Sequence, residues 1–313
     1  MNGKSPITMN DMPVSVSTRQ ASELLGAHES SVKRWCNAED LECWLTPGGH
    51  RRIPIAALVA FAQGQGIPLS LHPFGEDAGR VWAGLDRARR ENDFEALVEL
   101  TYGWIEQGWS HLPARLIEYL ATEGFSLDRI LDGLVGMVMR RVGHGYVEGG
   151  LSIGDEHRMT QAMRDVLVSL STAEDPATKP NGVERPVAVV GCARGEVHEL
   201  GALMVRLVLE AEGWRVVYLG LNVPTEEFAA QQTRYGATLM CISMIPPMGM
   251  TDAVTMMHFL DRMYDPAQPY RLALGGSALS NNGDLDRSGV QIQDTRLFNK
   301  MEPFAAWVRT FAA

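Results

Sequence analysis

The sequence has few cysteines and no long apolar run. Its four cysteines, Cys36, Cys43, Cys192 and Cys241, include no Cys-x-x-Cys pair, so neither a disulfide framework nor a structural zinc site is expected. No apolar stretch approaches the length of a membrane-spanning helix. Residues 1–15 lack the charged and apolar segments of a signal peptide. We therefore expect a cytoplasmic protein that does not associate with a membrane.

Positive charge is also in short supply. The 313 residues include 28 Lys and Arg against 38 Asp and Glu, a net charge of −10. This is the wrong sign for a protein that coats nucleic acid, so any contact with nucleic acid must come from a local basic patch. The composition, 45% hydrophobic and 21% charged, is that of an ordinary globular protein. The length suits two or three domains.

Residues 13–70 carry the pattern of a small domain that begins with two short helices. Residues 16–26 predict an N-capped helix that ends at a glycine, and either Ser30 or Ser31 is expected to cap the second helix. Two short helices joined by a tight turn are typical of a helix-turn-helix, in which the second is the recognition helix.

A hairpin is predicted directly after these helices. Pro-Gly-Gly at residues 47–49 turns the chain and brings a His-Arg-Arg run together at its tip and arm. This order of elements resembles the winged-helix DNA-binding domain of the MerR family. By that resemblance, major-groove or phosphate contacts would come from Arg19, Ser31, Lys33 and Arg34, and backbone or minor-groove contacts from His50, Arg51 and Arg52. Small winged helices also mediate protein contacts, and that alternative stays open.

The middle of the chain, residues 75–173, predicts a helical bundle. Apolar residues recur there at helical spacing and indicate four or five helices, the last two spanning about 127–146 and 153–171. Residues 67–75 contain two prolines and a terminal glycine, which is typical of an interdomain linker.

The remainder, residues 183–313, predicts a doubly wound α/β domain with a parallel sheet. Apolar runs at 187–190, 215–219, 239–243, 271–274 and 289–292 alternate with helical stretches. The loop Gly195 to Gly201 follows the first strand, and open α/β sheets bind their ligands at this end of their strands. Within it, Glu196 is expected to orient the His198 imidazole and raise its basicity.

The spacing downstream of this loop carries a second resemblance. Ser243 follows Gly201 after 41 intervening residues (202–242), and Gly275 follows Ile245 after 29 (246–274). This succession resembles the D-x-H-x-x-G, S-x-L and G-G signature of cobalamin-binding domains of the methionine synthase and methylmalonyl-CoA mutase type. The resemblance implies a flavodoxin-like fold with His198 as the lower axial ligand of cobalt. It also implies a cofactor-binding set of Glu196, Gly201, Ser243, Gly275 and Gly276, with Glu196 standing where the broad family has Asp.

A third stretch, residues 146–157, resembles the W-x9-E-H motif of CarH-type light-sensing transcriptional regulators, which join the same three kinds of module in this order. Glu156 and His157 match, whereas Tyr146 stands at the tryptophan position and Val147 replaces a histidine that follows it. In that group the tryptophan and the glutamate enclose the adenosyl group on cobalt, and the histidine after the tryptophan can capture cobalt once light has removed that group. His144 is a weaker candidate for the missing upper histidine, because a surface helix residue is the commoner role.

Together these patterns predict a non-enzymatic, light-responsive, cobalamin-dependent transcriptional regulator. We expect a repressor that light releases from a double-stranded DNA operator, through loss of the upper cobalt ligand and a change of the homo-oligomer, a dimer or tetramer. Adenosylcobalamin is the expected cofactor, with methylcobalamin and hydroxocobalamin as alternatives. The rival functions are a corrinoid methyl-transfer module and a MerR-like regulator switched by a protein partner without cofactor.

Overall fold

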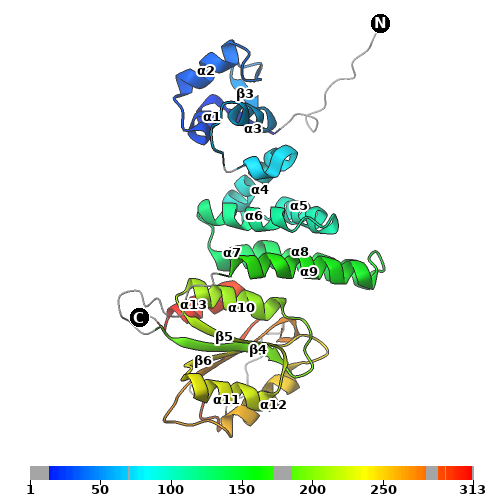
Figure 1. Ribbon diagram of the computed structural model, residues 1–313, viewed down its shortest axis with the longest axis vertical. Helices are drawn as coiled ribbons and strands as arrows, with labels where there is room; N and C mark the ends of the chain where they lie inside the picture. The colour runs from blue at the N-terminus through cyan, green and yellow to red at the C-terminus, as the bar shows by residue number, and fades with distance from the viewer. Residues whose placement is uncertain (1–13, 70, 172–184, 280–287, 293, 312–313) are drawn as a thin grey trace. The chain divides into compact units, whose positions relative to one another are not determined.

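The computed structural model describes residues 14–69, 71–171, 185–279, 288–292 and 294–311. These form two compact units, which are described separately (Figure 1). The first comprises residues up to 123 together with 137–152, and the second comprises 124–136 together with 153–313. None of the helices in the described ranges combines the length and apolarity that a bilayer crossing requires.

The first unit begins with the predicted pair of short helices. Helix α1 (Thr18–Leu25) is capped by Ser17, whose side chain accepts a hydrogen bond from the Gln20 amide, and it ends at Gly26 in the left-handed conformation. Helix α2 (Glu29–Asn37) starts earlier than predicted, with His28 at the N-cap position and no side-chain cap. The expectation that Ser30 or Ser31 caps α2 is therefore wrong, because both lie inside its first turn.

A small antiparallel sheet completes the N-terminal domain. Its strands β1 (Ser15–Ser17), β2 (Trp44–Leu45) and β3 (Arg51–Pro54) are ordered β1-β3-β2. The predicted hairpin joins β2 to β3, and the Thr46 amide donates to the His50 carbonyl across it, at 2.9 Å. Helix α3 (Ile55–Gly64) then packs beneath, with Ile55 and Leu58 fully buried beside Val16 and Ile53.

The rest of the first unit is helical, as predicted. It contains η2 (His72–Asp77), α4 (Ala78–Glu91), α5 (Glu95–Glu106), α6 (His111–Thr122) and most of α8 (Gly136–Val147). Helices α4 and α5 approach closely at Gly84, where an added Cβ would lie 2.5 Å from a methyl carbon of Leu97. The Trp104 indole N–H donates to the Asp77 carboxylate at 2.8 Å and ties α5 to the start of α4.

The helix predicted at about 127–146 has an interruption in its hydrogen bonding. It starts as α7 (Leu127–Ile130), passes through the π-helical segment η3 (Leu131–Val135) and continues as α8. Segments α7 and η3 belong to the second unit, whereas α8 from Met137 onward belongs to the first. The following prediction, a helix over 153–171, is confirmed by α9 (Ile153–Leu170), which also belongs to the second unit.

The second unit is built on a five-stranded parallel sheet in the order β5-β4-β6-β7-β8. Its strands are β4 (Val187–Ala193), β5 (Arg215–Val223), β6 (Leu239–Ser243), β7 (Arg271–Gly275) and β8 (Thr295–Phe298). Helices α10 (Leu200–Ala211) and α13 (Met301–Arg309) cover one face, and α11 (Thr225–Tyr235) and α12 (Met250–Asp261) cover the other (Figure 1). This confirms the predicted fold class: an N-terminal helix-turn-helix, a helical region and a doubly wound α/β domain.

The fifth strand does not lie where the sequence predicts it. Residues 289–292 are not a strand, and β8 begins at Thr295. The amides of Gln291 and Ile292 instead donate to one carboxylate oxygen of Asp261, at 2.6 and 3.0 Å. The apolar residues of that run signal burial, since Ile292 is only 3% exposed. Burial beside α12 and burial in a strand leave the same pattern in the sequence.

Polar contacts attach α7 and η3 to the last helix of the same unit. The Asp132 carboxylate accepts hydrogen bonds from the amides of Met301 and Glu302, at 2.8 and 2.9 Å, and so caps the N-terminus of α13. At the other end of α13, Arg309 pairs with Asp128 and Glu212. A residue far away in the sequence therefore supplies the cap that α13 lacks locally.

We predict that Asp132→Ala lowers the free energy of unfolding of the second unit by about 1–2 kcal/mol, the usual cost of losing a helix cap. Urea denaturation followed by tryptophan fluorescence measures this. Glu226→Ala is the control, because it removes an exposed carboxylate whose ion pair, within the described part of the chain, is with Arg194. Equal stabilities of the two variants would contradict the capping role.

Candidate functional site

The loop Gly195 to Glu199 leaves the carboxyl end of β4 and is fastened to the last residues of β5. Gly195 has φ +85°, a conformation that glycine adopts without strain. Its amide donates to the Asn222 side-chain oxygen at 2.7 Å, and the Asn222 amide donates to the Glu196 carbonyl at 3.1 Å. Asn222 itself has φ +52°, which asparagine tolerates better than most residues. The end of β5 therefore holds this loop in place at the carboxyl ends of the strands.

Glu196 is the buried centre of this loop, with 2% of its surface exposed. One carboxylate oxygen accepts from the His198 amide at 2.8 Å and contacts the His198 Nδ1 at 2.7 Å. The other accepts from the Ile245 amide, 2.7 Å away in the loop after β6. A carboxylate removed from water is stable only when hydrogen bonds replace its hydration, and these three donors do so.

The contact with Glu196 decides which nitrogen of His198 carries the proton. A carboxylate can only accept, so it assigns the proton to Nδ1 and leaves the Nε2 lone pair available. The His198 side chain is 56% exposed. A carboxylate behind an imidazole in this way orients the ring and raises the basicity of the other nitrogen, as it does for metal-bound histidines. The predicted role of Glu196 as the orienting group thus has the geometry it needs.

The serine and glycines of the predicted site lie at the ends of neighbouring strands. Ser243 is the last residue of β6 and pairs in register with Gly275 at the end of β7. A Cβ added to Gly201 would lie 3.0 Å from the Ser243 hydroxyl oxygen, so a larger residue at 201 would crowd the space beside that serine. The structure therefore brings Gly201, Ser243 and Gly275 together at the edge that carries His198.

Gly276 is required by its backbone. Its φ is +119°, and a Cβ there would lie 2.1 Å from the Met244 carbonyl oxygen, so every other residue type is excluded without a backbone shift. Gly275 is almost as restricted, since its Cβ would lie 2.9 Å from the Phe298 carbonyl oxygen. The two glycines therefore leave backbone without side chains at the carboxyl end of β7.

The side chains that could bind a metal at this site suit a metal ion that is already held in a macrocycle. Across the described ranges, no three His, Cys, Asp or Glu side chains gather in a way that would hold a bare metal ion. Cys192 lies close by at the end of β4, but burial raises the pKa of its thiol to about 12, so it is not an anionic ligand at neutral pH. One exposed imidazole beside a glycine-lined edge fits a corrinoid, because the ring nitrogens of a corrinoid already supply most of the ligands of cobalt.

The residues predicted to lie near the upper ligand of cobalt belong to different units. His144, Tyr146 and Val147 lie at the exposed end of α8 in the first unit, with Val147 82% exposed. Glu156 and His157 lie in the first turns of α9 in the second unit, where the His157 Nε2 is 3.5 Å from the Glu156 carboxylate. Their shared role beside the upper ligand of cobalt stays a prediction.

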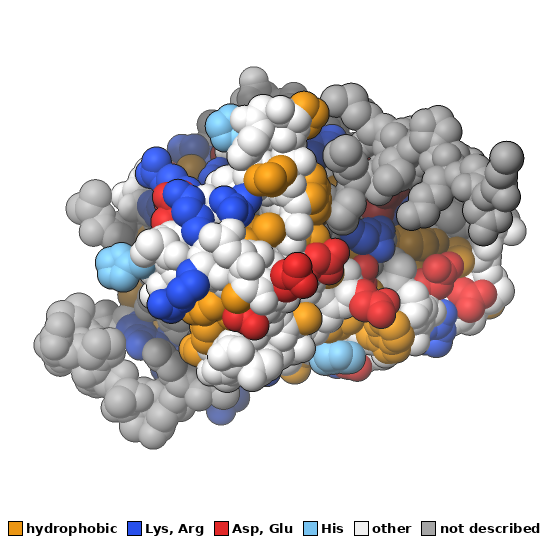
Figure 2. Space-filling view, turned by 90° about the horizontal axis from the view of Figure 1, so that it is seen from above, with side chains coloured by type: hydrophobic (Ala, Val, Ile, Leu, Met, Phe, Trp, Pro, Cys, Tyr) orange, Lys and Arg blue, Asp and Glu red, His pale blue; other side chains and the backbone are white. Residues whose placement is uncertain are grey.

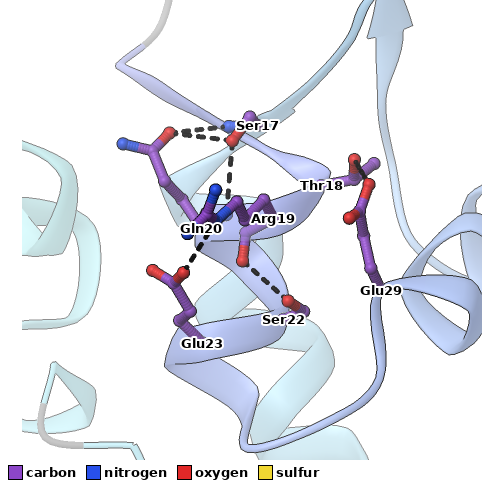
Figure 3. A network of polar contacts seen from close by, with 7 residues as sticks. All are labelled: Ser17, Thr18, Arg19, Gln20, Ser22, Glu23 and Glu29. Carbon is purple, nitrogen blue, oxygen red and sulfur yellow. Dashed lines mark hydrogen bonds and ion pairs between the residues drawn. The ribbon is translucent and has the colours of Figure 1, made fainter.

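The predicted DNA-contacting residues of the helices lie on α1 and α2. Arg19 projects from α1 with 81% of its side chain exposed and pairs with Glu23 (Figure 3). Lys33 and Arg34 are exposed on α2, and Lys33 pairs with Glu29 at 2.8 Å. Ser31 is half-buried in the first turn of α2. Lys and Arg side chains gather on the left of the face seen in Figure 2, whereas Asp and Glu side chains lie in its middle and on its right.

The wing residues differ in how free they are to contact DNA. His50 is exposed near the tip of the hairpin, whereas Arg51 and Arg52 are half-buried on β3. Arg51 donates to the Asn37 side chain at the end of α2, and Arg52 donates to the Ser15 carbonyl at 3.1 Å. Both arginines therefore also hold the wing against the rest of the domain, a role that the sequence pattern does not reveal.

We predict that Gly276→Ala destabilises the second unit by at least about 2 kcal/mol, since it combines backbone strain with a steric clash. Thermal or urea denaturation measures the loss. Gly249→Ala is the matched control, because its backbone is extended and no neighbouring atom lies within 4 Å of the added Cβ. A Gly276→Ala protein as stable as the control would contradict the tight approach to Met244.

The chain resembles known proteins in both of its parts. A family described as a helix-turn-helix domain matches residues 15–66, and one described as a B12 binding domain matches residues 186–293. Corrinoid protein DSY3155 of Desulfitobacterium hafniense (strain Y51) is 24% identical over 177 residues, which are 56% of this chain and 81% of that protein. The HTH-type transcriptional repressor CarH of Myxococcus xanthus is 32% identical over 99 residues, 32% of this chain and 31% of that repressor.

Among solved structures, the monomethylamine corrinoid protein of Methanosarcina barkeri aligns with 68% of this chain and 96% of its own, at 17% identity and a TM-score of 0.49. The two domain matches each coincide with one of the regions described above: the helix-turn-helix with its wing, and the parallel sheet that carries His198. The chain therefore joins a helix-turn-helix domain to a B12-binding domain.

Proposed function

We propose that this protein is a cobalamin-dependent transcriptional regulator, a repressor that light releases from DNA. The observation that carries the proposal is the buried Glu196 carboxylate that fixes the exposed His198 imidazole for metal binding, in a chain that also has a helix-turn-helix domain. Neither feature alone separates a regulator from a corrinoid carrier. Their combination favours a DNA-binding protein whose cofactor reports a signal.

In this proposal His198 is the lower axial ligand of cobalt, bound through Nε2, and Glu196 keeps the ring in the required tautomer. Gly201, Ser243, Gly275 and Gly276 leave room beside the sheet for the nucleotide tail of the cofactor. When adenosylcobalamin is bound, it supplies a cobalt–carbon bond that visible light breaks. The protein contributes binding, orientation and the change of state.

The helical region is proposed to detect the upper ligand through Tyr146, Val147, Glu156 and His157. Loss of a buried adenosyl group would remove packing and change the homo-oligomer, for which a dimer or a tetramer is proposed. Inverting a 99:1 population requires a differential affinity of roughly 5.5 kcal/mol, which burial of a group of this size is able to supply. Each oligomer would present a different number of winged helices to DNA.

DNA contacts are proposed for the exposed basic side chains of α1 and α2, chiefly Arg19, Lys33 and Arg34, with His50 at the wing. Arg51 and Arg52 would combine a DNA contact with their bonds to Asn37 and Ser15. Because the whole chain carries a net charge of −10, binding would depend on this patch and fall steeply with salt.

A corrinoid methyl-transfer module is the second candidate function. The 24% identity to a corrinoid protein over 81% of its length favours it, and the helix-turn-helix domain speaks against it. Transfer of a methyl group from bound methylcobalamin to a thiol or folate would support this candidate, with no change in DNA affinity. A regulator switched by a protein partner would show neither corrin absorbance nor methyl transfer.

We predict that His198→Ala abolishes ligation of cobalt by a protein nitrogen, and that Glu196→Gln weakens cobalamin binding about 10- to 100-fold. Absorption spectra and equilibrium titration of apoprotein with adenosylcobalamin in darkness measure both effects. His258→Ala, which removes an exposed histidine of α12, is the control and should bind normally. Wild-type affinity in the His198→Ala protein would refute the assignment of the lower ligand.

We predict that green light weakens operator binding by the adenosylcobalamin-loaded protein at least 10-fold and changes its oligomer size. Gel-shift titration and analytical ultracentrifugation, in darkness and after illumination, measure these changes at one fixed salt concentration, because the phosphate contribution depends on salt. Apoprotein treated in the same way is the control. Equal affinity and size in both conditions would eliminate the light switch.

A further inference from the structure

Glu199, the residue directly after His198, is held by two side chains from other elements. It occupies the N-cap position of α10, and its side chain is only 14% exposed. One carboxylate oxygen pairs with the Arg164 guanidinium of α9, and the other accepts a hydrogen bond from the Tyr218 hydroxyl of β5, at 3.1 Å. Hydrogen bonds to a charged group are short and directional, so these two bonds fix the position of the Glu199 carboxylate.

These contacts leave His198 between two anchored carboxylates. On the N-terminal side, Glu196 is held by the Ile245 amide, and on the C-terminal side Glu199 is held by Arg164 and Tyr218. The Cys192 thiol also contacts the His198 carbonyl oxygen, at 3.6 Å. The backbone on both sides of the imidazole is therefore positioned by groups outside the loop, which limits how far the ring can move.

Arg164 lies on the same face of α9 as Glu156, which is predicted to enclose the adenosyl group. Glu156, Thr160 and Arg164 follow one another at intervals of four residues, so they form one row along the helix. The Thr160 hydroxyl donates to the Glu156 carboxylate at 2.8 Å. Polar contacts thus connect Glu156 with Thr160 at one end of the row and Arg164 with the His198 loop at the other.

The ion pair is not needed to attach α9 to the α/β domain. The adjoining side of α9 already buries Met159, Met163, Val166 and Leu167, and the helix packs against α10. Buried apolar side chains of this size supply most of the attachment energy, whereas a partly exposed ion pair contributes little. The attachment of α9 to the α/β domain therefore does not explain why Arg164 and Tyr218 both bond to Glu199.

We propose that Arg164 and Tyr218 are positioning residues that act through Glu199 to hold His198 in place for cobalt. Through them, α9 couples Glu156, which is predicted to enclose the adenosyl group, to the loop that carries His198. This inference rests on the proposed role of His198. Movement of α9 when the upper ligand is lost would then reach the lower ligand by way of Arg164 and Glu199.

The test compares full-length Arg164→Met and Tyr218→Phe proteins with wild type after each is loaded with cobalamin and reduced to the Co(II) state. Histidine in all proteins carries the heavy nitrogen isotope, so ligation by His198 splits the paramagnetic resonance signal into doublets instead of triplets. Cobalamin affinity is titrated in parallel. Arg158→Met is the matched control, because Arg158 lies on the same helix and pairs with Asp155.

We expect doublets in wild type and in Arg164→Lys and Arg158→Met proteins. In Arg164→Met we expect loss of much of the doublet signal and about 10-fold weaker cobalamin binding. Tyr218→Phe, which removes only a hydroxyl, should cause a smaller loss of the same kind. The Arg164→Met/Glu199→Gln double variant should bind no more weakly than the weaker single variant, because both substitutions break one interaction.

Full doublets and unchanged affinity in Arg164→Met and Tyr218→Phe would overturn the positioning role while leaving the proposed function intact. Additive losses in the double variant would overturn the route through Glu199. A wild-type spectrum without doublets would instead refute His198 as the ligand, and with it the proposed function. If Arg164→Met does not fold, the Tyr218→Phe protein decides between these outcomes.

Discussion

The site depends on one buried carboxylate. Glu196 is almost completely removed from water, and it is stable there because the imidazole and amide of His198 and the amide of Ile245 all donate to it. The same bonds join the loops after β4 and β6 and set the tautomer of the histidine. Charge burial, loop geometry and the tautomer of the histidine thus share a single cause. The remaining features of the site, from Asn222 to Gly276, shape the surroundings of this pair.

A second network extends this arrangement toward the helical region. Glu199, Arg164 and Tyr218 join α9 and β5 to the residue after His198. Nearby, Asp132 caps α13 and holds η3 to the α/β domain. π-helical segments such as η3 are frequent at functional sites.

The N-terminal domain shows how a protein with excess negative charge is able to present a basic surface. Arg19, Lys33 and Arg34 are exposed, yet Arg19 and Lys33 already pair with Glu23 and Glu29. Exposed pairs of this kind are worth less than about 1 kcal/mol. In the proposed complex with DNA, phosphates would therefore replace these carboxylates at little cost. Arg51 and Arg52, by contrast, are bonded within the domain and shape the wing.

The sequence by itself determined the modules and the local chemistry of the site. Period and capping residues predicted α1, α9 and four of the five strands, because those signals are local: Ser17 and Gly26 bound α1 within the helix itself. The loop around His198 was also predictable, since Glu196 is two residues away and its carboxylate reaches the imidazole without help from distant segments.

Only the tertiary structure decided the contacts between segments far apart in the chain. The Ile245 amide on Glu196, the Arg164 and Tyr218 bonds to Glu199, and the Asp132 cap on α13 join residues 19 to 170 positions apart. The misplaced fifth strand has the same origin, because Asp261 takes the amides of residues 291 and 292 out of the sheet. Such pairings depend on which segments the folded chain brings together, and no local pattern of residue types encodes them.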